Sequence, residues 1–284
     1  MKKFTIILFT FIMLLTGCTS AVRHNYLILI DNSSSVPMAV INRYLGSIEK
    51  TILTKLGDKD KVTVQFIDGC SQLKSERIFN LDMAEKDFSN IRDGINHAAD
   101  SAKVRRERYL NGEIKKEILA AIGAKRIERS DCGGYTDIIN AIAEVAKLVE
   151  NTSNSQTTFG QIINNAKGEE NYIYETCLVL FSDMINENQT RTYDFSSFGK
   201  IKEDKVITKV NDLKASEKLP DLSKVKVFVF GATSSAHAKA FAGSQLENIK
   251  LFWELYFKAT GADLKAYGYD TELEMKKYIA DSNK

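Results

Sequence analysis

Residues 26–36, YLILIDNSSSV, place five apolar residues directly before an aspartate and a cluster of hydroxyl-bearing side chains. A continuous apolar run of this length is typical of a strand that is buried on both faces of a parallel sheet. Alternate residues of an extended chain point the same way, so the side chains of Asp31, Ser33 and Ser35 can converge on one point. The stretch therefore predicts a central strand whose carboxyl end presents oxygen atoms.

The rest of the chain alternates strand and helix patterns. We expect further strands at 61–68, 177–181, 225–230 and 264–269, and a hairpin partner for the second strand at 75–83. Apolar stripes at helical spacing predict helices that begin near residues 37, 136 and 246. A capping box at Thr271 and Glu274 predicts a short terminal helix. This alternation predicts an α/β doubly wound, Rossmann-like fold, with a mostly parallel six-stranded sheet, one antiparallel edge strand and helices on both faces.

The predicted domain organisation is a single domain over residues 26–284 with two insertions. The first, at about 84–131, is polar and helical, with lysines, arginines and glutamates interleaved. A solvated helical face is the leading interpretation of such charge patterning, and a partner-binding insertion is the alternative. The second, at about 184–222, is mostly polar and shows no clear period.

The amino-terminal residues resemble a bacterial lipoprotein signal. A basic start and a short apolar run over residues 4–15 precede the motif LTGC at 15–18, as in a secretory signal that is too short to span a membrane. The resemblance implies a signal peptide over 1–17, acylation of Cys18 and a lipidated tether over 18–25. An ordinary signal peptide with a chance cysteine is the alternative.

Charge and cysteine content narrow the class of protein further. The chain has 39 Lys and Arg against 37 Asp and Glu, and losing Lys2 and Lys3 with the signal would balance the two. A neutral chain has no global field to attract nucleic acid, so no nucleic-acid partner is expected. Outside the cytoplasm, Cys70 and Cys132 are predicted to form a disulfide and Cys177 to stay a buried thiol; three free thiols are the alternative.

Oxygen-bearing residues also mark two other places where ligands bind in open α/β sheets, beyond the carboxyl ends of the strands. Thr136 opens a helix after the sequence CGGY, and Asp183 follows the apolar strand at 177–181. Together with the first strand end they offer carboxylates and hydroxyls but no required histidine or thiolate. Hard divalent cations prefer this ligand set, which predicts Mg²⁺ or Mn²⁺ as the cofactor.

The motif D-x-S-x-S at 31–35, followed by Thr136 and Asp183, resembles the metal-ion-dependent adhesion site (MIDAS) of von Willebrand factor type A (VWA) domains. The resemblance covers about residues 26–269 and implies a VWA fold. It implies that Ser33 and Ser35 bind the cation directly, and that Thr136 binds it when a ligand is present. Asp31 and Asp183 would act largely through water, and an Asp or Glu of a protein partner would fill the open position.

Enzymatic functions find less support. The chain lacks G-x-G-x-x-G, P-loop and G-x-S-x-G motifs. His24, His97 and His237 are scattered; we expect His24 to be exposed, and His237 could approach the metal face. The leading prediction is a non-enzymatic, membrane-anchored module that captures an acidic residue of a protein partner, with no small-molecule substrate. A Mg²⁺-dependent phosphohydrolase and a VWA scaffold without metal are the alternatives.

The predicted place of action is the cell envelope, with a role in adhesion or in envelope, secretion or conjugation assembly. Thr19, rather than an aspartate, follows Cys18. In a Gram-negative cell this resembles sorting to the outer membrane, so the domain would face the periplasm or the surface.

Overall fold

The computed structural model describes residues 21–71, 77–88, 102–154, 172–188, 193–195, 202–216, 218–232 and 243–282. The predicted signal peptide, the predicted acylation site Cys18, His97 and His237 lie outside the described residues. Within them, no helix is both long and apolar enough to cross a membrane.

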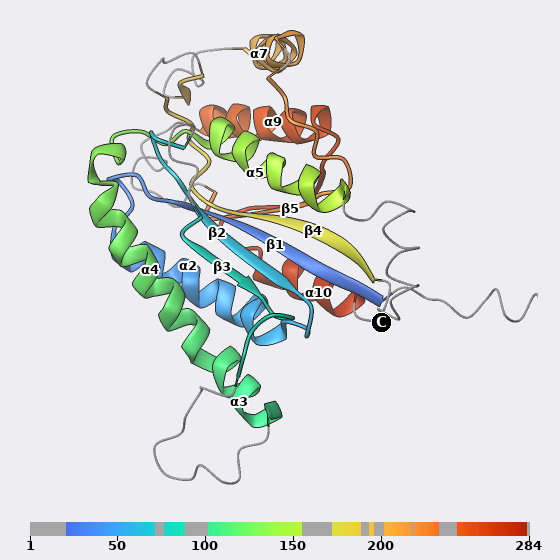
Figure 1. Ribbon diagram of the computed structural model, residues 1–284. Helices are drawn as coiled ribbons and strands as arrows, with labels where there is room; N and C mark the ends of the chain where they lie inside the picture. Colours follow the sequence, from blue (N-terminus) through green and yellow to red (C-terminus); the bar gives the residue numbers. More distant parts are fainter. Residues whose placement is uncertain are drawn as a thin grey trace, which may run out of the picture.

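A six-stranded sheet forms the centre of the molecule (Figure 1). Its strand order is β3-β2-β1-β4-β5-β6, and every neighbouring pair is parallel except β2 and β3. The strands are β1 (Ala21–Asp31), β2 (Lys61–Ile67), β3 (Phe79–Asp82), β4 (Tyr172–Phe181), β5 (Lys226–Phe230) and β6 (Asp263–Tyr267). The predicted doubly wound α/β fold, with one antiparallel edge strand, is confirmed.

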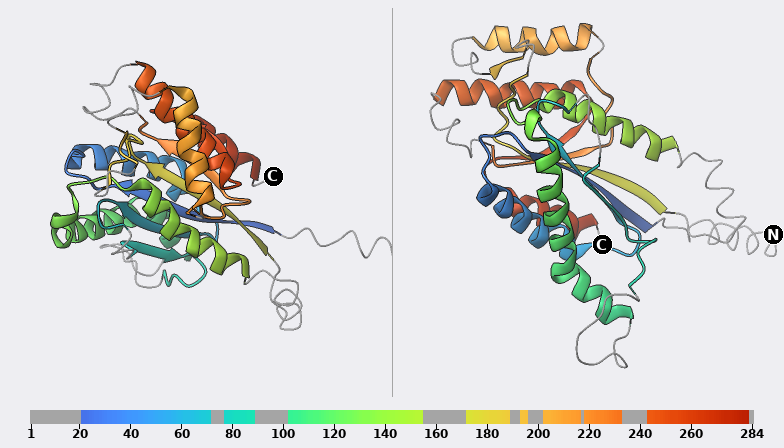
Figure 2. Two further views of the ribbon diagram at one scale, coloured as in Figure 1. Left: turned by 90° about the horizontal axis from the view of Figure 1, so that it is seen from above. Right: turned by 60° about the vertical axis from the view of Figure 1, so that its left-hand side comes forward.

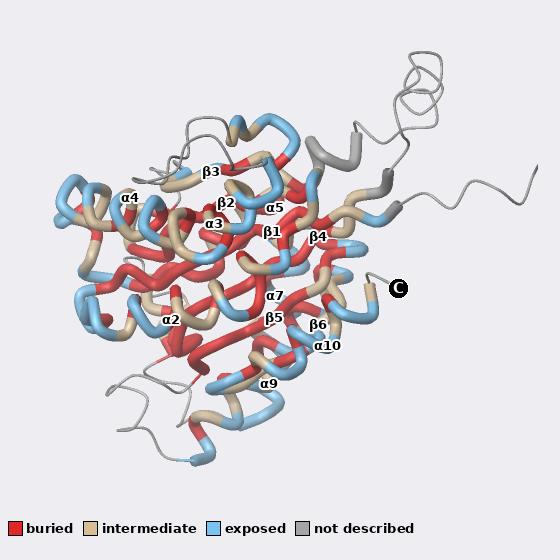
Figure 3. The backbone as a smooth tube through the Cα atoms, turned by 90° about the horizontal axis from the view of Figure 1, so that it is seen from below, coloured by how far each residue is buried: buried red, intermediate tan, exposed pale blue. Residues whose placement is uncertain are grey.

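Helices cover both faces of the sheet, as Figures 1 and 2 show. One face packs against α2 (Met38–Thr51), α4 (Ile114–Glu128) and α10 (Glu272–Ser282), and α3 (Ala102–Arg108) leads into α4. The other face packs against α5 (Ile138–Asn154) and α9 (Gly243–Ala259), and α7 (Glu203–Ala215) lies on the outer side of α9. Figure 3 shows the strands as the buried layer between these helices.

The apolar run of β1 is buried on both faces because its alternate side chains enter different cores. Leu27 and Leu29 pack with α5 and α9, whereas Tyr26, Ile28 and Ile30 pack with α2 and α10. Burial of apolar area on both sides stabilises a central strand, at roughly 25 cal/mol for each Å² removed from water. This packing fixes the point at which β1 ends, with Asp31 as its last residue.

The first strand begins earlier than the sequence predicts. β1 starts at Ala21, so it takes in most of the predicted tether at 18–25, and β4 starts at Tyr172. The two strands pair in register from Ala21 and Tyr172 onward. The extension is held by backbone hydrogen bonds, which do not require apolar side chains. Because the residues just before Tyr26 are polar, the hydrophobic pattern of the sequence did not indicate a strand there. His24, expected to be exposed, is 2% exposed within the extension.

The two predicted insertions both contain helices with a buried face. In the first, a π-helical turn (Tyr109–Glu113) joins α3 to α4, and Ile114, Ile118 and Ile122 pack into the core beside α2. Only one side of this segment therefore faces solvent, and the other side packs into the core. In the second, α7 buries Val206, Val210 and Leu213, a stripe of helical spacing that the sequence-based prediction missed.

Candidate metal centre

Three segments that are distant in sequence meet at the carboxyl edge of the sheet. The loop after β1 contacts the turn before α5, because the Ser34 amide donates a 2.7 Å hydrogen bond to the carbonyl oxygen of Gly133. The same loop contacts the end of β4, because the Ser182 hydroxyl donates a 3.0 Å hydrogen bond to Asp31 Oδ2. The structure thus brings together the three segments that carry the predicted metal ligands.

Asp31 is the last residue of β1 and is 1% exposed. Its second carboxylate oxygen, Oδ1, accepts a 2.9 Å hydrogen bond from the Ser33 amide. Burial, and then the negative charge of Asp183, raise the pKa of Asp31 to about 7. Among the described residues no basic side chain forms an ion pair with Asp31.

The hydroxyl groups of Ser33 and Ser35 lie 2.9 Å apart, as the D-x-S-x-S pattern predicts for side chains that converge. Ser33 is buried and Ser35 is exposed. A backbone hydrogen bond from the Val36 amide to the Ser33 carbonyl closes the turn just before α2. The pair therefore runs from the buried carboxylate of Asp31 toward solvent.

Thr136 is held against the segment that follows β4. It forms an isolated antiparallel bridge with Glu187, through hydrogen bonds of 2.9 and 2.8 Å between their backbones. Asn186 strengthens this junction, because its Oδ1 accepts hydrogen bonds from the amides of Ile138 and Ile139 in the first turn of α5. Asn186, in the segment that follows β4, thus caps α5, the helix that begins just after Thr136.

Asp183 is 8% exposed, and its Oδ1 accepts a 2.9 Å hydrogen bond from the Ile185 amide. The next residue, Met184, has a φ of +66°, which is uncommon for a residue other than glycine. The indole nitrogen of Trp253 in α9 donates a 2.9 Å hydrogen bond to the Met184 carbonyl, which holds the turn in place. Such backbone strain concentrates at functional sites.

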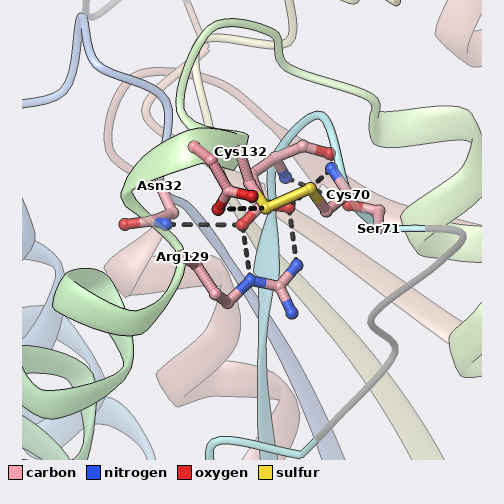
Figure 4. The surroundings of a disulfide bond; sticks show 7 residues. Asn32, Cys70, Ser71, Arg129 and Cys132 are labelled. Carbon is pink, nitrogen blue, oxygen red and sulfur yellow. Dashed lines mark hydrogen bonds and ion pairs between the residues drawn. A yellow bond between two sulfur atoms is a disulfide. The ribbon is translucent and has the colours of Figure 1, made fainter.

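Beside these segments, the structure contains the predicted disulfide between Cys70 and Cys132 (Figure 4). Asp68 and the two cysteines lie close enough together to resemble a metal cluster, but disulfide sulfurs are not thiolates and do not bind metal as thiolates do. Cys177 is a buried free thiol, and burial raises its pKa to about 12.

Two residues at this edge, Asn186 and Arg129, were not singled out from the sequence, and Ser182 was noted only as the residue before Asp183. Ser182 bonds Asp31, Asn186 caps α5, and Arg129 forms a buried ion pair with Asp68. A signal existed for Asp68, which follows β2 as Asp31 follows the apolar run of β1. Nothing in the sequence near Arg129 indicates its partner, which lies 61 residues away.

The candidate ligands fit a hard divalent cation. Their atoms are all oxygen, from two carboxylates and three hydroxyls, and the two carboxylates are close enough for one to raise the pKa of the other. A cation between such groups favours their charged forms. Mg²⁺ and Mn²⁺ prefer oxygen ligands of this kind.

A separate polar cavity of about 320 Å³ opens at the amino end of the strands, lined by Asn25, Lys61, Thr63 and Tyr174 among others. It shares no lining residue with the candidate metal centre. The candidate metal centre lies at the opposite, carboxyl end of the parallel strands.

No family model and no curated protein matches this chain. A solved structure of proximal thread matrix protein 1 from the mussel byssus is similar over 93% of this chain, with 13% identity and a TM-score of 0.38. This chain covers 48% of that protein chain, about half its length. A similarity at this level carries no argument about function.

Proposed function

We propose that this chain is a membrane-anchored binding module of the VWA type. It holds Mg²⁺ or Mn²⁺ through Asp31, Ser33, Ser35, Thr136 and Asp183, and it captures an Asp or Glu side chain of a protein partner. Acylation at Cys18 anchors it in the cell envelope. The single observation that carries the proposal is the buried Asp31 carboxylate, which has Asp183 and, among the described residues, no base beside it, next to two converging hydroxyls.

Each residue has a role that follows from its place. The Ser33 amide and the Ser182 hydroxyl orient the Asp31 carboxylate. The hydroxyls of Ser33 and Ser35 reach from that carboxylate toward solvent, where a partner approaches. A bound divalent cation would supply the positive charge that binds the partner's carboxylate. We therefore propose binding, and not catalysis, as the chemistry of this set.

Peptide selection tests the proposal even though the partner is unidentified. The purified full chain would be immobilised and exposed to a displayed library of random peptides in Mg²⁺, and bound peptides would be eluted with EDTA. We expect the eluted peptides to be enriched in Asp or Glu at one position. Substitution of that acid by Asn or Gln should weaken binding at least tenfold.

The decisive variant is Thr136→Val, which removes a hydroxyl and keeps the shape of the side chain. On our account this variant loses most of the enrichment, whereas the matched control Thr208→Val, at an exposed hydroxyl in α7, keeps it. Peptides that bind equally well in EDTA, or that lack acidic residues, would refute metal-mediated capture.

A further inference from the structure

The end of α4 is joined to the loop after β2 by a buried ion pair. Arg129 Nε lies 2.9 Å from Asp68 Oδ2, and Arg129 Nη2 lies 2.6 Å from Asp68 Oδ1. Arg129 is 5% exposed and Asp68 is 0% exposed. Two parallel hydrogen bonds between a guanidinium and a carboxylate fix both position and orientation.

The same two segments are also joined covalently, just beyond the ion pair along the chain. The disulfide connects Cys70 with Cys132, and the Gly69 amide donates a 2.9 Å hydrogen bond to the Cys132 carbonyl. The backbones approach so closely that a Cβ at Gly69 would lie 3.1 Å from this carbonyl oxygen and 3.2 Å from Tyr135 Cβ. We call the Asp68–Arg129 pair and the Cys70–Cys132 disulfide together the clasp (Figure 4).

The clasp is connected to both flanking parts of the candidate metal centre. Asp68 Oδ2, which accepts from Arg129, also accepts a 3.3 Å hydrogen bond from Asn32 Nδ2, between Asp31 and Ser33. On the other side, Gly133 follows Cys132 directly, and its carbonyl accepts the hydrogen bond from the Ser34 amide. The carboxylate of Asp68 therefore ties together the exits of β1, β2 and α4.

We propose that the clasp is a positioning device for the metal centre, so that the affinity for the divalent cation depends on residues that do not bind it. This inference rests on the proposed function of the same site. Thr136 stands four residues after Cys132, at the end of a turn that contains Gly133 and Gly134. The clasp holds the start of this turn, and the bridge to Glu187 holds its end.

The physical reason is preorganisation. A centre whose ligands come from separate loops must order those loops when the cation binds, and loops that are already held in place remove that cost from the affinity. Supporting contacts around metal ligands typically change affinity by 10- to 100-fold. Opening the clasp frees the turn before Thr136 while β1, β4 and β5 keep their pairing, so affinity should fall although the fold remains.

The test is a titration of the purified full chain with Mn²⁺, followed by the electron paramagnetic resonance signal of the free ion. We expect the double variant Cys70→Ser, Cys132→Ser to bind Mn²⁺ about tenfold more weakly than the parent. Cys177→Ala, which removes the buried free thiol in β4, is the matched control and should change the affinity less than twofold. Arg129→Lys, which keeps the charge but loses the fork, should weaken binding by an intermediate factor.

Reduction of the parent gives a second route that does not depend on the folding of a variant. A phosphine cleaves the disulfide to two thiols, and it is itself oxidised to the phosphine oxide with oxygen from water. Mn²⁺ affinity should fall as in the double variant and return after reoxidation. An affinity that is unchanged in both the reduced chain and the double variant overturns the proposal.

Amide hydrogen exchange in EDTA separates this inference from the proposed function. The double variant should exchange faster than the parent at Ser34 and Thr136, with little change at Val227 and Val229 of β5. If the parent binds no Mn²⁺, the proposed function fails, and the exchange result still decides the clasp. Equal exchange at Ser34 and Thr136 in parent and variant would show that the clasp does not position these loops.

Discussion

Acidic side chains have different neighbours at the amino edge of the sheet, where the parallel strands begin, and at the carboxyl edge, where they end. At the amino edge the acids face bases: Lys226 lies 2.9 Å from Asp263, and His24 Nδ1 lies 3.8 Å from Asp60. At the carboxyl edge Asp68 has Arg129, but Asp31 faces Asp183. Buried like charges are costly unless something else compensates them. Under the proposed function, a bound cation would supply the charge that compensates Asp31.

Burial shifts the pKa of one group at each edge, in opposite directions. Burial and the charge of Asp183 raise the pKa of Asp31 to about 7. Burial lowers the pKa of His24, and the nearby Asp60 opposes this only in part. The folded chain therefore prefers the neutral form of both groups, and the two edges should respond to pH in opposite directions.

The largest expected effect is at Asp31. Between about pH 4 and pH 7 the folded chain keeps a proton there that the unfolded chain has released, so each rise in pH favours unfolding. A pKa shift from 3.8 to about 7 corresponds to a loss on the order of 4 kcal/mol across this range. In EDTA at pH 8, Asp31→Asn should therefore be more stable than the parent in urea unfolding. The gain should be smaller than this amount, because the amide nitrogen cannot accept one of the two hydrogen bonds that the carboxylate accepts.

Two further conditions sharpen this prediction. The advantage of Asp31→Asn should shrink as the pH falls toward 4, because the parent carboxyl is then protonated in the folded state and increasingly so in the unfolded state. Saturating Mg²⁺ should also reduce it, because a cation stabilises the charged parent and not the amide. A parent that is equally stable at pH 5 and pH 8 in EDTA would contradict the account of this edge.

A smaller effect is expected at Ser182. Its buried hydroxyl donates to Asp31 Oδ2 and accepts a 3.1 Å hydrogen bond from the Met184 amide. Ser182→Ala leaves buried partners unsatisfied and should cost about 1–3 kcal/mol in urea unfolding. Ser216→Ala, at an exposed residue that follows α7, should cost less than about 0.5 kcal/mol. Equal costs for the two would mean that Ser182 has no special part in supporting Asp31.

The smallest effect is expected at His24, at the other edge. Below about pH 6.5 the unfolded chain takes up a proton on this imidazole before the folded chain does, so acid favours unfolding. His24→Gln removes the imidazole that takes up this proton, so the variant should lose less stability than the parent between pH 7 and pH 5. Thermal unfolding at the two pH values measures it, and identical losses would show that His24 does not titrate in the way its burial predicts.

Patterns within one segment were readable from the sequence, and so were the contacts between segments that cysteines or strand ends mark, such as the Cys70–Cys132 disulfide. Other contacts between segments were not. The run before Asp31 predicted a buried strand, and the serines after it predicted converging hydroxyls that the structure places 2.9 Å apart. The sequence did not predict the extension of β1 to Ala21, because this extension depends on backbone pairing with the β4 segment that starts at Tyr172 and carries polar side chains. The sequence did not predict the Asp68–Arg129 ion pair, because the partners of an ion pair stand at no regular spacing along the chain.

Calorimetric titration of Mn²⁺ into the full chain, beside Asp31→Asn, tests the central claim most directly. We predict that the parent binds one ion per chain, and that the variant binds at least tenfold more weakly because it has lost the carboxylate at the centre of the site. At pH 6 the parent should also release a proton on binding, because the cation displaces the one that Asp31 retains there. No binding by the parent, or equal binding by both proteins, would contradict the claim that this edge of the sheet is a metal centre.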